Sequence, residues 1–213
     1  MAALIRSARP EDAPFLAWCI LVAGRAHLRR GWYDIALGLG EAGCLEALTR
    51  LVLTEAPSWW RYDRWLVAEI DGAPAAGLAA FGANAFVASE TALSQALSGL
   101  GWGPAQIGEV WRRGAYVFSC TMSPEDHEVW VIENVAVRPE RRGQGLVGQL
   151  IARALELGRA EGFADAQISF VIGNAPAERA YARAGFGPIE ERRHPDFEAA
   201  AGSPGLKRFG RAL

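Results

Sequence analysis

The segment from Val129 to Leu155 constrains the fold of this chain most, because it joins an apolar strand, a glycine-rich turn and an amphipathic helix. Val129–Val137 (VWVIENVAV) is a run of apolar residues typical of a buried strand. After the turn, apolar residues recur at the spacing of one helical face: Leu146, Val147, Leu150, Ile151, Ala154 and Leu155. A strand that leads into such a helix favours an α/β architecture, with helices packed on the faces of a sheet.

The remaining elements follow from periodicity and from turn residues. Strands are expected at Leu4–Arg9, Trp65–Ile70, Pro74–Phe81, Tyr116–Cys120 and Ala166–Ile172, with a last one after Phe186. Helices are expected at Ala13–Gly24, about 41–54 and Ala175–Ala184. Asp71-Gly72 between two apolar runs predicts a hairpin. Residues 82–114 are predicted to form an elaborated connection near a substrate site, and the absence of repeats and linkers predicts one domain over residues 1–213.

Composition excludes several classes of protein. The 213 residues carry a formal net charge of −2, so the chain has no basic field for a nucleic-acid partner. Ala13–Gly24 is apolar but follows Glu11 and Asp12, where a signal peptide would be basic. It is also shorter than the roughly 20 residues that span a bilayer. We therefore expect a cytoplasmic protein without a membrane partner.

The cysteines and histidines show no pattern of metal ligands. Cys19, Cys44 and Cys120 are far apart, and none has a ligand spacing to a histidine. The prediction is no metal and three buried thiols in a reducing compartment, with a disulfide or a nucleophilic thiol as the alternative. His27, His127 and His194 have no serine or carboxylate partner at a recognisable spacing. His127 lies in a polar loop before the strand at Val129, within reach of an acceptor amine, although a solvent-exposed loop histidine is the simpler interpretation.

The glycine-rich turn allows two functional interpretations. Gly143–Gly148 fits G-x-G-x-x-G, and Asp165 follows where a dinucleotide-binding fold has its ribose carboxylate. However, Arg138–Arg142 separates the strand from the first glycine, and only 65 residues follow Gly148. Alternatively, the glycines expose backbone N–H groups at a helix N-terminus, where they bind a pyrophosphate. A solvated turn with exposed arginines would have the same sequence.

Three stretches resemble one known family. Arg142-x-x-Gly145-x-Val147 is similar to the acyl-CoA loop of the GNAT superfamily of N-acyltransferases, Gln/Arg-x-x-Gly-x-Gly/Ala, with valine at the last position. The run IENVAVRPERRGQG, which ends at Gly145, resembles that family's fourth strand and loop. Asn174, followed by a helix that bears Tyr181 and ends in Gly-Phe, resembles its second signature. The stretch IRSARPEDAPFL resembles the usual first strand and helix. The resemblance is specific from about 129 to 186.

The resemblance implies a fold and a set of site residues. The fold is a central mixed, mostly antiparallel sheet of about six to seven strands flanked by helices, with splayed fourth and fifth strands. Glu133 is implied as general base and Tyr181 as general acid beside the departing sulfur. Acyl-CoA is expected to contact one set of residues: Val135, Ala136, Val137, Arg142, Gly143, Gln144, Gly145, Leu146, Val147, Gly148, Asn174 and Tyr181. A surface carboxylate, a half-buried aromatic ring and a plain turn are the structural alternatives for Glu133, Tyr181 and Asn174.

The expected function is transfer of an acetyl or short acyl group from acetyl-CoA to a primary amine by direct attack on the thioester. The acceptor is a small molecule or a protein amine, and the resemblance allows a homodimer. One alternative is an acyl-CoA-binding module without turnover, and a remote one is a nicotinamide-dependent oxidoreductase. Trp32 and the pair Trp59-Trp60 lie in turn-like stretches where aromatic rings would either line the acceptor site or fill gaps at the edge of the core.

Overall fold

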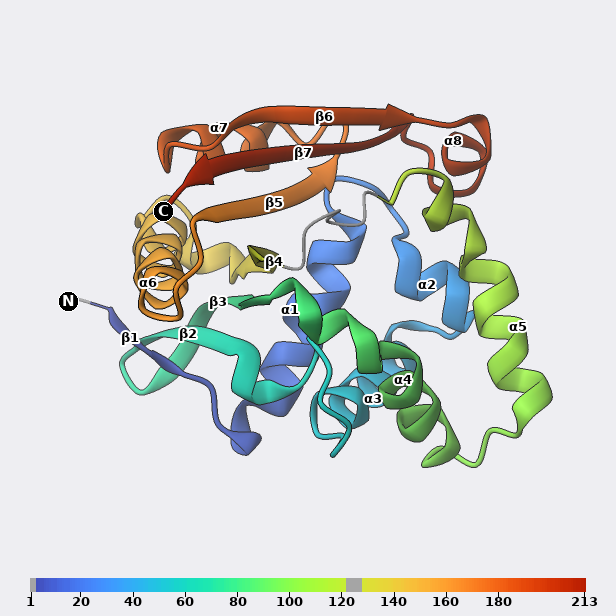
Figure 1. Cartoon of the computed structure of the whole chain (residues 1–213). Helices are drawn as coiled ribbons and strands as arrows, with labels where there is room; N and C mark the ends of the chain where they lie inside the picture. Colours follow the sequence, from blue (N-terminus) through green and yellow to red (C-terminus); the bar gives the residue numbers. More distant parts are fainter. Residues whose placement is uncertain (1–2, 122–127) are drawn as a thin grey trace.

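The computed structural model describes residues 3–121 and 128–213, and a seven-stranded mixed sheet lies at the centre of this part of the chain (Figure 1). The strands are β1 (Leu4–Ser7), β2 (Trp65–Ile70), β3 (Ala73–Gly82), β4 (Val129–Val137), β5 (Asp165–Val171), β6 (Gly187–Arg193) and β7 (Gly205–Ala212). Their order is β1-β2-β3-β4-β5-β7-β6, and every neighbouring pair is antiparallel except β4 and β5, which are parallel. The predicted α+β class and strand number are confirmed.

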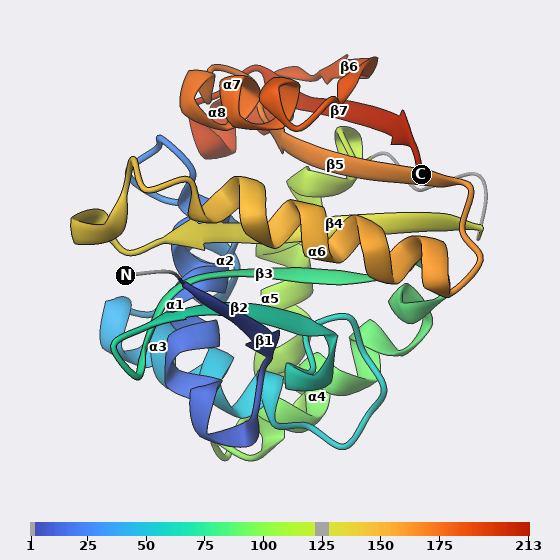
Figure 2. The ribbon, with the colours of Figure 1, turned by 90° about the vertical axis from the view of Figure 1, so that its left-hand side faces the viewer.

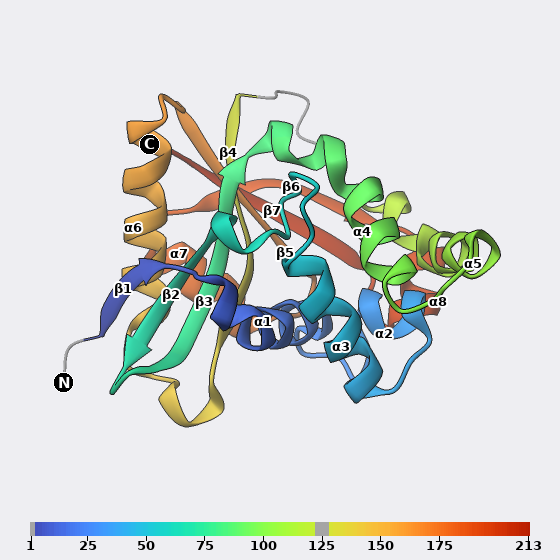
Figure 3. The same cartoon turned by 90° about the horizontal axis from the view of Figure 1, so that it is seen from below.

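Helices cover both faces of this sheet. The α-helices are α1 (Ala13–Arg25), α2 (Trp32–Leu37), α3 (Glu41–Val52), α4 (Ser89–Ser98), α5 (Pro104–Gly114), α6 (Leu146–Ala160), α7 (Ala175–Arg183) and α8 (Pro195–Ala201). Short 3-10 helices are η1 (Pro10–Asp12), η2 (Tyr62–Arg64), η3 (Ala83–Ala88), η4 (Ala115–Ser119) and η5 (Pro139–Arg141). Figure 3 shows α6 on one side of the sheet and α1 to α5 on the other. No helix within the described ranges is long and apolar enough to cross a membrane.

The two layers bury two separate apolar clusters. The first cluster lies between the sheet and α1 to α5, and it contains Leu16, Val67 and Val131. The second cluster lies under α6 and α7, and it contains Leu150 and Ile132. Val131 and Ile132 fall in different clusters because successive strand residues point to opposite faces. Burial of each such side chain contributes about 1.5–3 kcal/mol.

The hairpin between β2 and β3 forms where Asp71-Gly72 predicts it. Both turn residues have positive φ, 54° at Asp71 and 76° at Gly72. This combination is typical of the type I′ turn, which Asp-Gly favours because glycine has no Cβ to clash.

Three expectations about the secondary structure are wrong. Tyr116–Cys120 was expected as a strand, but residues 115–119 form η4. The aromatic and β-branched residues there suit a strand, yet the segment packs on α8 outside the sheet, with Tyr116 against Phe197. The single strand expected after Phe186 is a pair, β6 and β7, with α8 between them. The stretch around Trp32, expected to be turn-like, runs into a helix at its second half, because α2 begins at Trp32.

The elaborated connection after β3 consists of η3, α4, α5 and η4. Helix α5 packs on α2, where Trp32 Nε1 donates a hydrogen bond of 2.9 Å to the Gly114 carbonyl. The ring of Tyr116 in η4 packs edge-on against Phe197 in α8, with 5.5 Å between the centroids. The connection therefore links the first helices to the C-terminal hairpin.

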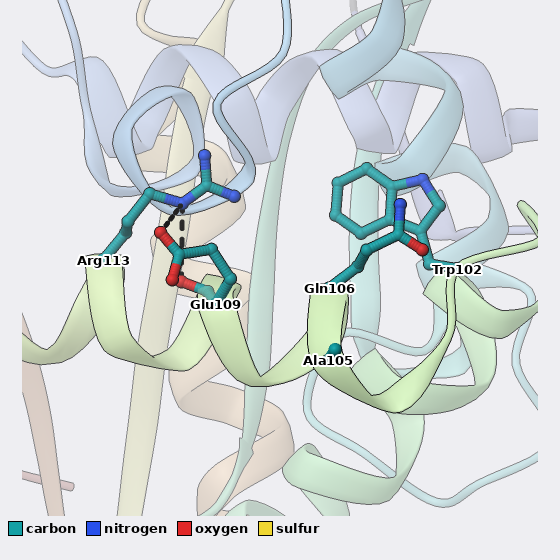
Figure 4. A pocket seen from close by; sticks show the side chains of 5 residues that line it. All are labelled: Trp102, Ala105, Gln106, Glu109 and Arg113. Carbon is teal, nitrogen blue, oxygen red and sulfur yellow. Dashed lines mark hydrogen bonds and ion pairs between the residues drawn. The ribbon is translucent and has the colours of Figure 1, made fainter.

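A hollow on the outer surface of this connection is separate from the central strands. It is lined by Trp102, Ala105, Gln106, Glu109 and Arg113 (Figure 4). The Arg113 guanidinium lies 3.6 Å from the Glu109 carboxylate, so both charges are already paired. No lining residue comes from β4, α6 or α7.

The three cysteines are free and buried, as predicted. Burial raises the pKa of the Cys19 and Cys44 thiols, which therefore stay protonated at neutral pH.

Candidate active site

A β-bulge in the middle of β4 shapes the candidate site. In the ladder with β3, Ala79 pairs with Glu133 and Gly77 pairs with Ala136, so Leu78 faces two residues of β4. One of the two, Asn134, has φ of 54°, a left-handed conformation that asparagine tolerates better than most residues. The bulge bends β4 immediately after Glu133.

The parallel pair β4 and β5 separates at the same place. Their register runs from Val129↔Asp165 to Ile132↔Ile168 and includes no later residue. Beyond Ile132 the two strands diverge towards the loop that precedes α6 (Figure 2). The β4 edge over Glu133–Val137 therefore faces a gap in the sheet rather than a paired strand, as the predicted splay of these strands requires.

Glu133 lies at the apex of this gap. Alternation from Val129 and Val131 places its side chain on the face that α1 to α3 cover. Burial raises the pKa of its carboxyl from an ordinary 4.5 to about 7. Because water has less access to this side chain, its charged form is disfavoured, and the carboxylate binds a proton readily near neutral pH.

Tyr181 approaches from the opposite side of the sheet. It belongs to α7 and to the second cluster, is 7% exposed, and its ring packs edge-on against Phe170 at 5.5 Å. Burial, reinforced by the charge of Glu133, raises the pKa of its hydroxyl above the ordinary value of 10. The hydroxyl is therefore protonated at neutral pH and able to donate.

The glycine-rich loop ends in an uncapped helix N-terminus. Gly143 and Gly145 have φ of 76° and 74°, and Gly145 is the N-cap of α6 without any side-chain hydrogen bond. A Cβ added to Gly143, Gly145 or Gly148 would meet no atom within 4 Å, so the loop borders open space. Gln144 is exposed, whereas Leu146 is buried and anchors the helix. The first-turn amides of α6, at Leu146 to Gly148, carry the positive end of the helix dipole.

The arginines around the loop have different surroundings. Arg141 lies 3.6 Å from the Asp71 carboxylate. Arg138 packs its guanidinium over the Trp18 ring, 4.2 Å from the centroid, and over Phe15 at 5.2 Å. Arg142 is exposed and has no ion pair among the described residues. Arg142 is thus the cation of this loop that can turn to an incoming anion.

The remaining predicted contact residues lie along the two sides of the gap. Val135 and Val137 are half-buried against the second cluster, and Ala136 is buried in the first. Asn174 Oδ1 accepts a hydrogen bond of 3.4 Å from the Ala177 amide and caps α7. Asn134 adds a side-chain amide that the sequence analysis did not assign. Its Nδ2 is buried and has no hydrogen-bond partner.

Sequence reasoning also missed Tyr33. It is 5% exposed in α2, and its hydroxyl accepts a hydrogen bond of 2.7 Å from Trp60 Nε1. The charge of Glu133 contributes to the raised pKa of Tyr33, after burial. No motif marks this residue, which lies in the first cluster on the face of the sheet that α2 covers.

The tryptophans mainly pack the first cluster. Trp65 and Trp60 are 1% and 4% exposed, and Trp32 is half-buried between α2 and α5. Trp59 is half-buried and packs 4.3 Å from Trp60 and 5.8 Å from Phe81, measured between ring centroids. For Trp32 and Trp60 the structure supports the gap-filling interpretation.

The histidines do not form a catalytic or metal cluster in the described chain. His127 lies outside the described residues. His194 caps α8, and the exposed His27 ring lies against Gly173. No group of three His, Cys, Asp or Glu residues among those described is arranged to hold a metal ion.

The sheet thus opens between Glu133 and the uncapped N-terminus of α6, and the chain is an acetyltransferase by its family. The model of the acetyltransferase (GNAT) family matches residues 41–186, and the chain belongs to this family. Curated proteins gave no significant match to the sequence. The glycine-rich loop does not belong to a doubly wound dinucleotide-binding fold, because the sheet is mostly antiparallel.

Solved structures share this fold over nearly the whole chain. An N-acetyltransferase from Staphylococcus aureus Mu50 is 20% identical with a TM-score of 0.68, covering 99% of this chain and 100% of that chain. The aminoglycoside acetyltransferase AAC(6')-Ib in complex with coenzyme A is 18% identical, with a TM-score of 0.54 and coverage of 99% and 95%. The yncA protein of Salmonella typhimurium with its cofactor acetyl-CoA is 16% identical, with a TM-score of 0.55 and coverage of 100% and 95%. At these identities the likeness shows the fold.

Proposed function

We propose that this acetyltransferase moves an acetyl or short acyl group from acetyl-CoA to a primary amine by direct attack of the amine on the thioester. The observation that carries the proposal is the position of Glu133. It lies where β4 leaves β5, with a pKa near 7 and with Tyr181 on the other side of the gap. A base and an acid on opposite sides of one opening suit a reaction that removes a proton from one reactant and supplies one to another.

The residues around the opening fit acetyl-CoA as co-substrate. The α6 N-terminus, with Gly143 and Gly145 and the exposed Arg142, suits the pyrophosphate. The free edge of β4 over Val135–Val137 suits the amide groups of the pantetheine arm. The unpartnered Asn134 Nδ2 is a buried donor beside the same edge, and buried donors normally have partners. Asn174, at the start of α7, would flank the arm on the β5 side.

The chemistry assigned to this chain is proton transfer and positioning. Glu133 accepts the proton that the amine nitrogen loses as its bond to the acetyl carbon forms. Tyr181 donates its proton to the sulfur as the carbon–sulfur bond breaks. A backbone amide of the bulge at Asn134 or Val135 stabilises the charge that develops on the carbonyl oxygen. Each proton-transfer role is expected to contribute about 10²–10⁴-fold to the rate.

An amine screen tests the proposal. Acetyl-CoA consumption is followed with arylalkylamines, polyamines, amino acids, peptides and aminoglycosides, the last because of the structural similarity to an aminoglycoside acetyltransferase. The wild-type protein should acetylate at least one class of amine. In Glu133→Gln, the acidic limb of the pH–rate profile should disappear, so that activity rises with pH as free amine accumulates. Full activity of both Glu133→Gln and Tyr181→Phe at neutral pH would refute the assigned site.

Ligand-induced thermal stabilisation separates this function from its alternatives. Acetyl-CoA at 100 times its Kd should stabilise the native state by about 2.7 kcal/mol and raise the melting temperature. NADH should leave it unchanged. Binding of acetyl-CoA without acetylation of any amine would instead favour a module that holds acyl-CoA without turnover.

A further inference from the structure

The side-chain amide of Asn134 lies on β4 where the sheet opens, and the proton transfers give it no part. Its Nδ2 is buried and donates to no acceptor among the described residues. A buried N–H donor without a partner costs stability, so native proteins rarely keep one unless a ligand or a water molecule completes it. Its acceptor is therefore expected on a molecule that enters the opening.

The bulge in β4 explains the backbone of Asn134 but not its amide. The residue lies where Leu78 of β3 faces two residues of β4, and the ladder between β4 and β5 has already ended at Ile132. Its φ of 54° is accessible to asparagine, and glycine adopts such values at less cost. Glycine would thus form the same bulge without leaving a donor unpaired.

The Asn134 side chain is able to present its donor to a ligand. The residue is half-buried, as are its neighbours Glu133 and Val135. Its terminal amide turns about χ2, a torsion with broad energy minima. No hydrogen bond from Nδ2 to a described residue fixes this torsion, so the amide can turn towards an oxygen atom that arrives beside it.

The order of residues along β4 decides which oxygen atom of acetyl-CoA lies nearest. With the pyrophosphate at the α6 N-terminus and the arm along Val135–Val137, the thioester lies at the Glu133 end of the edge. Strand residues rise by about 3.3 Å each, so Asn134 is next to Glu133 and roughly 10 Å from Val137. The attacking nitrogen must lie within hydrogen-bond reach of Glu133 and about 3 Å from the carbonyl carbon. The thioester oxygen therefore falls nearer to Asn134 than the amide oxygens of the arm.

We propose that Asn134 polarises the thioester: its Nδ2 donates a hydrogen bond to the carbonyl oxygen of acetyl-CoA. This inference rests on the proposed function. As the amine nitrogen bonds to the carbonyl carbon, an electron pair of the C=O bond moves to the oxygen, and it returns when the carbon–sulfur bond breaks and the sulfur takes the proton of Tyr181. The side-chain amide stabilises the charged oxygen together with the backbone amide of the bulge. Adjacent residues of β4 thus serve the amine and the carbonyl group.

Glycine and alanine at position 134 separate this role from that of a bulge former. Asn134→Gly keeps the left-handed conformation and removes the amide, so kcat should fall about 10²–10³-fold, the usual cost of losing one oxyanion donor. Asn134→Ala should show the same fall and also a lower melting temperature, because alanine tolerates φ of 54° less well than asparagine. Asp71→Gly removes a polar side chain at the same φ in the turn between β2 and β3, and it should keep the wild-type kcat. A wild-type kcat in Asn134→Gly would overturn the inference.

A pair of ligands gives a second readout that does not depend on turnover. S-ethyl-CoA has a methylene group where acetyl-CoA has the thioester carbonyl, and the two molecules are otherwise alike. In calorimetry the wild-type protein should bind acetyl-CoA several-fold more tightly than S-ethyl-CoA, and this preference should shrink in Asn134→Gly. With ¹³C at the thioester carbonyl, its infrared stretching frequency should be lower in the wild-type complex than in the Asn134→Gly complex. An equal loss of affinity for both ligands would place the amide on the pantetheine arm and overturn the inference.

These results are separable from those that test the proposed function. If the protein acetylates amines, but the ligand preference and the carbonyl frequency are the same in wild type and Asn134→Gly, the inference fails and the function stands. If no amine is acetylated, but both readouts change as stated, the proposed function fails and the contact between Asn134 and the thioester stands.

Discussion

Replacement of Glu133 by glutamine should stabilise the protein at alkaline pH while it removes the proposed base. The pKa of the half-buried Glu133 carboxyl is raised from 4.5 to about 7, so the folded state binds the proton more tightly than the unfolded state. The stability that this preference gives is fully present below pH 4.5 and is lost as pH rises through 7. Each unit of difference between the folded and unfolded pKa corresponds to about 1.4 kcal/mol. At pH 8 the ionised Glu133 side chain therefore lowers the free energy of unfolding by about 3 kcal/mol.

Glutamine avoids this cost because it does not ionise. The free energy of unfolding of Glu133→Gln should therefore exceed that of the wild-type protein by about 3 kcal/mol at pH 8, a rise in melting temperature of roughly 6–12 °C for a chain of this size. At pH 5 the difference should shrink to about 1 kcal/mol. Urea denaturation at pH 5 and pH 8 measures it, with Glu161→Gln at the exposed end of α6 as the control that should show no such trend. A difference that does not change with pH would refute the argument that burial sets the Glu133 pKa.

The remaining predictions concern binding and turnover. Gly145→Asp should abolish acetyl-CoA binding in calorimetry, because it puts a negative charge at the α6 N-terminus and forces a side chain onto a residue with φ of 74°. The control variant Gly108→Asp, on α5 where an added Cβ meets no atom, should bind acetyl-CoA normally. Tyr181→Phe should lower kcat about 10²-fold at nearly unchanged acetyl-CoA affinity, and an unaltered kcat would contradict its role as acid. Trp59→Ala should raise the acceptor KM several-fold without changing acetyl-CoA binding, whereas Trp32→Ala, which empties a packed position between α2 and α5, should lower the melting temperature without a selective effect on the acceptor KM. Equal losses of melting temperature and of both substrates' binding in Trp59→Ala would show that this ring, too, is only structural.

Elements with strong periodicity were predictable from the sequence, and elements that depend on distant partners were not. The bounds of β4 were predicted correctly, and α3 and β5 were predicted to within two residues, because their apolar patterns are continuous. By contrast, α2 has six residues and is held by contacts outside itself, such as the ion pair between Arg25 and Asp34 at 2.7 Å. A helix this short has little stability of its own, so its sequence carries little signal.

The site shows the same division within a single strand. The alternation of strand residues correctly places Glu133 and Ile132 on opposite faces of the sheet. If the alternation continued without interruption, Val135 and Val137 would lie on the same face as Glu133. In the structure both valines pack in the second cluster with Ile132, because the bulge at Asn134 inserts one residue and reverses the pattern. The same bulge turns the strand away from β5 and leaves peptide groups unpaired beside the carboxylate. Pattern reasoning thus locates the residues of β4, whereas their arrangement around an opening depends on one left-handed residue whose conformation only the folded sheet imposes.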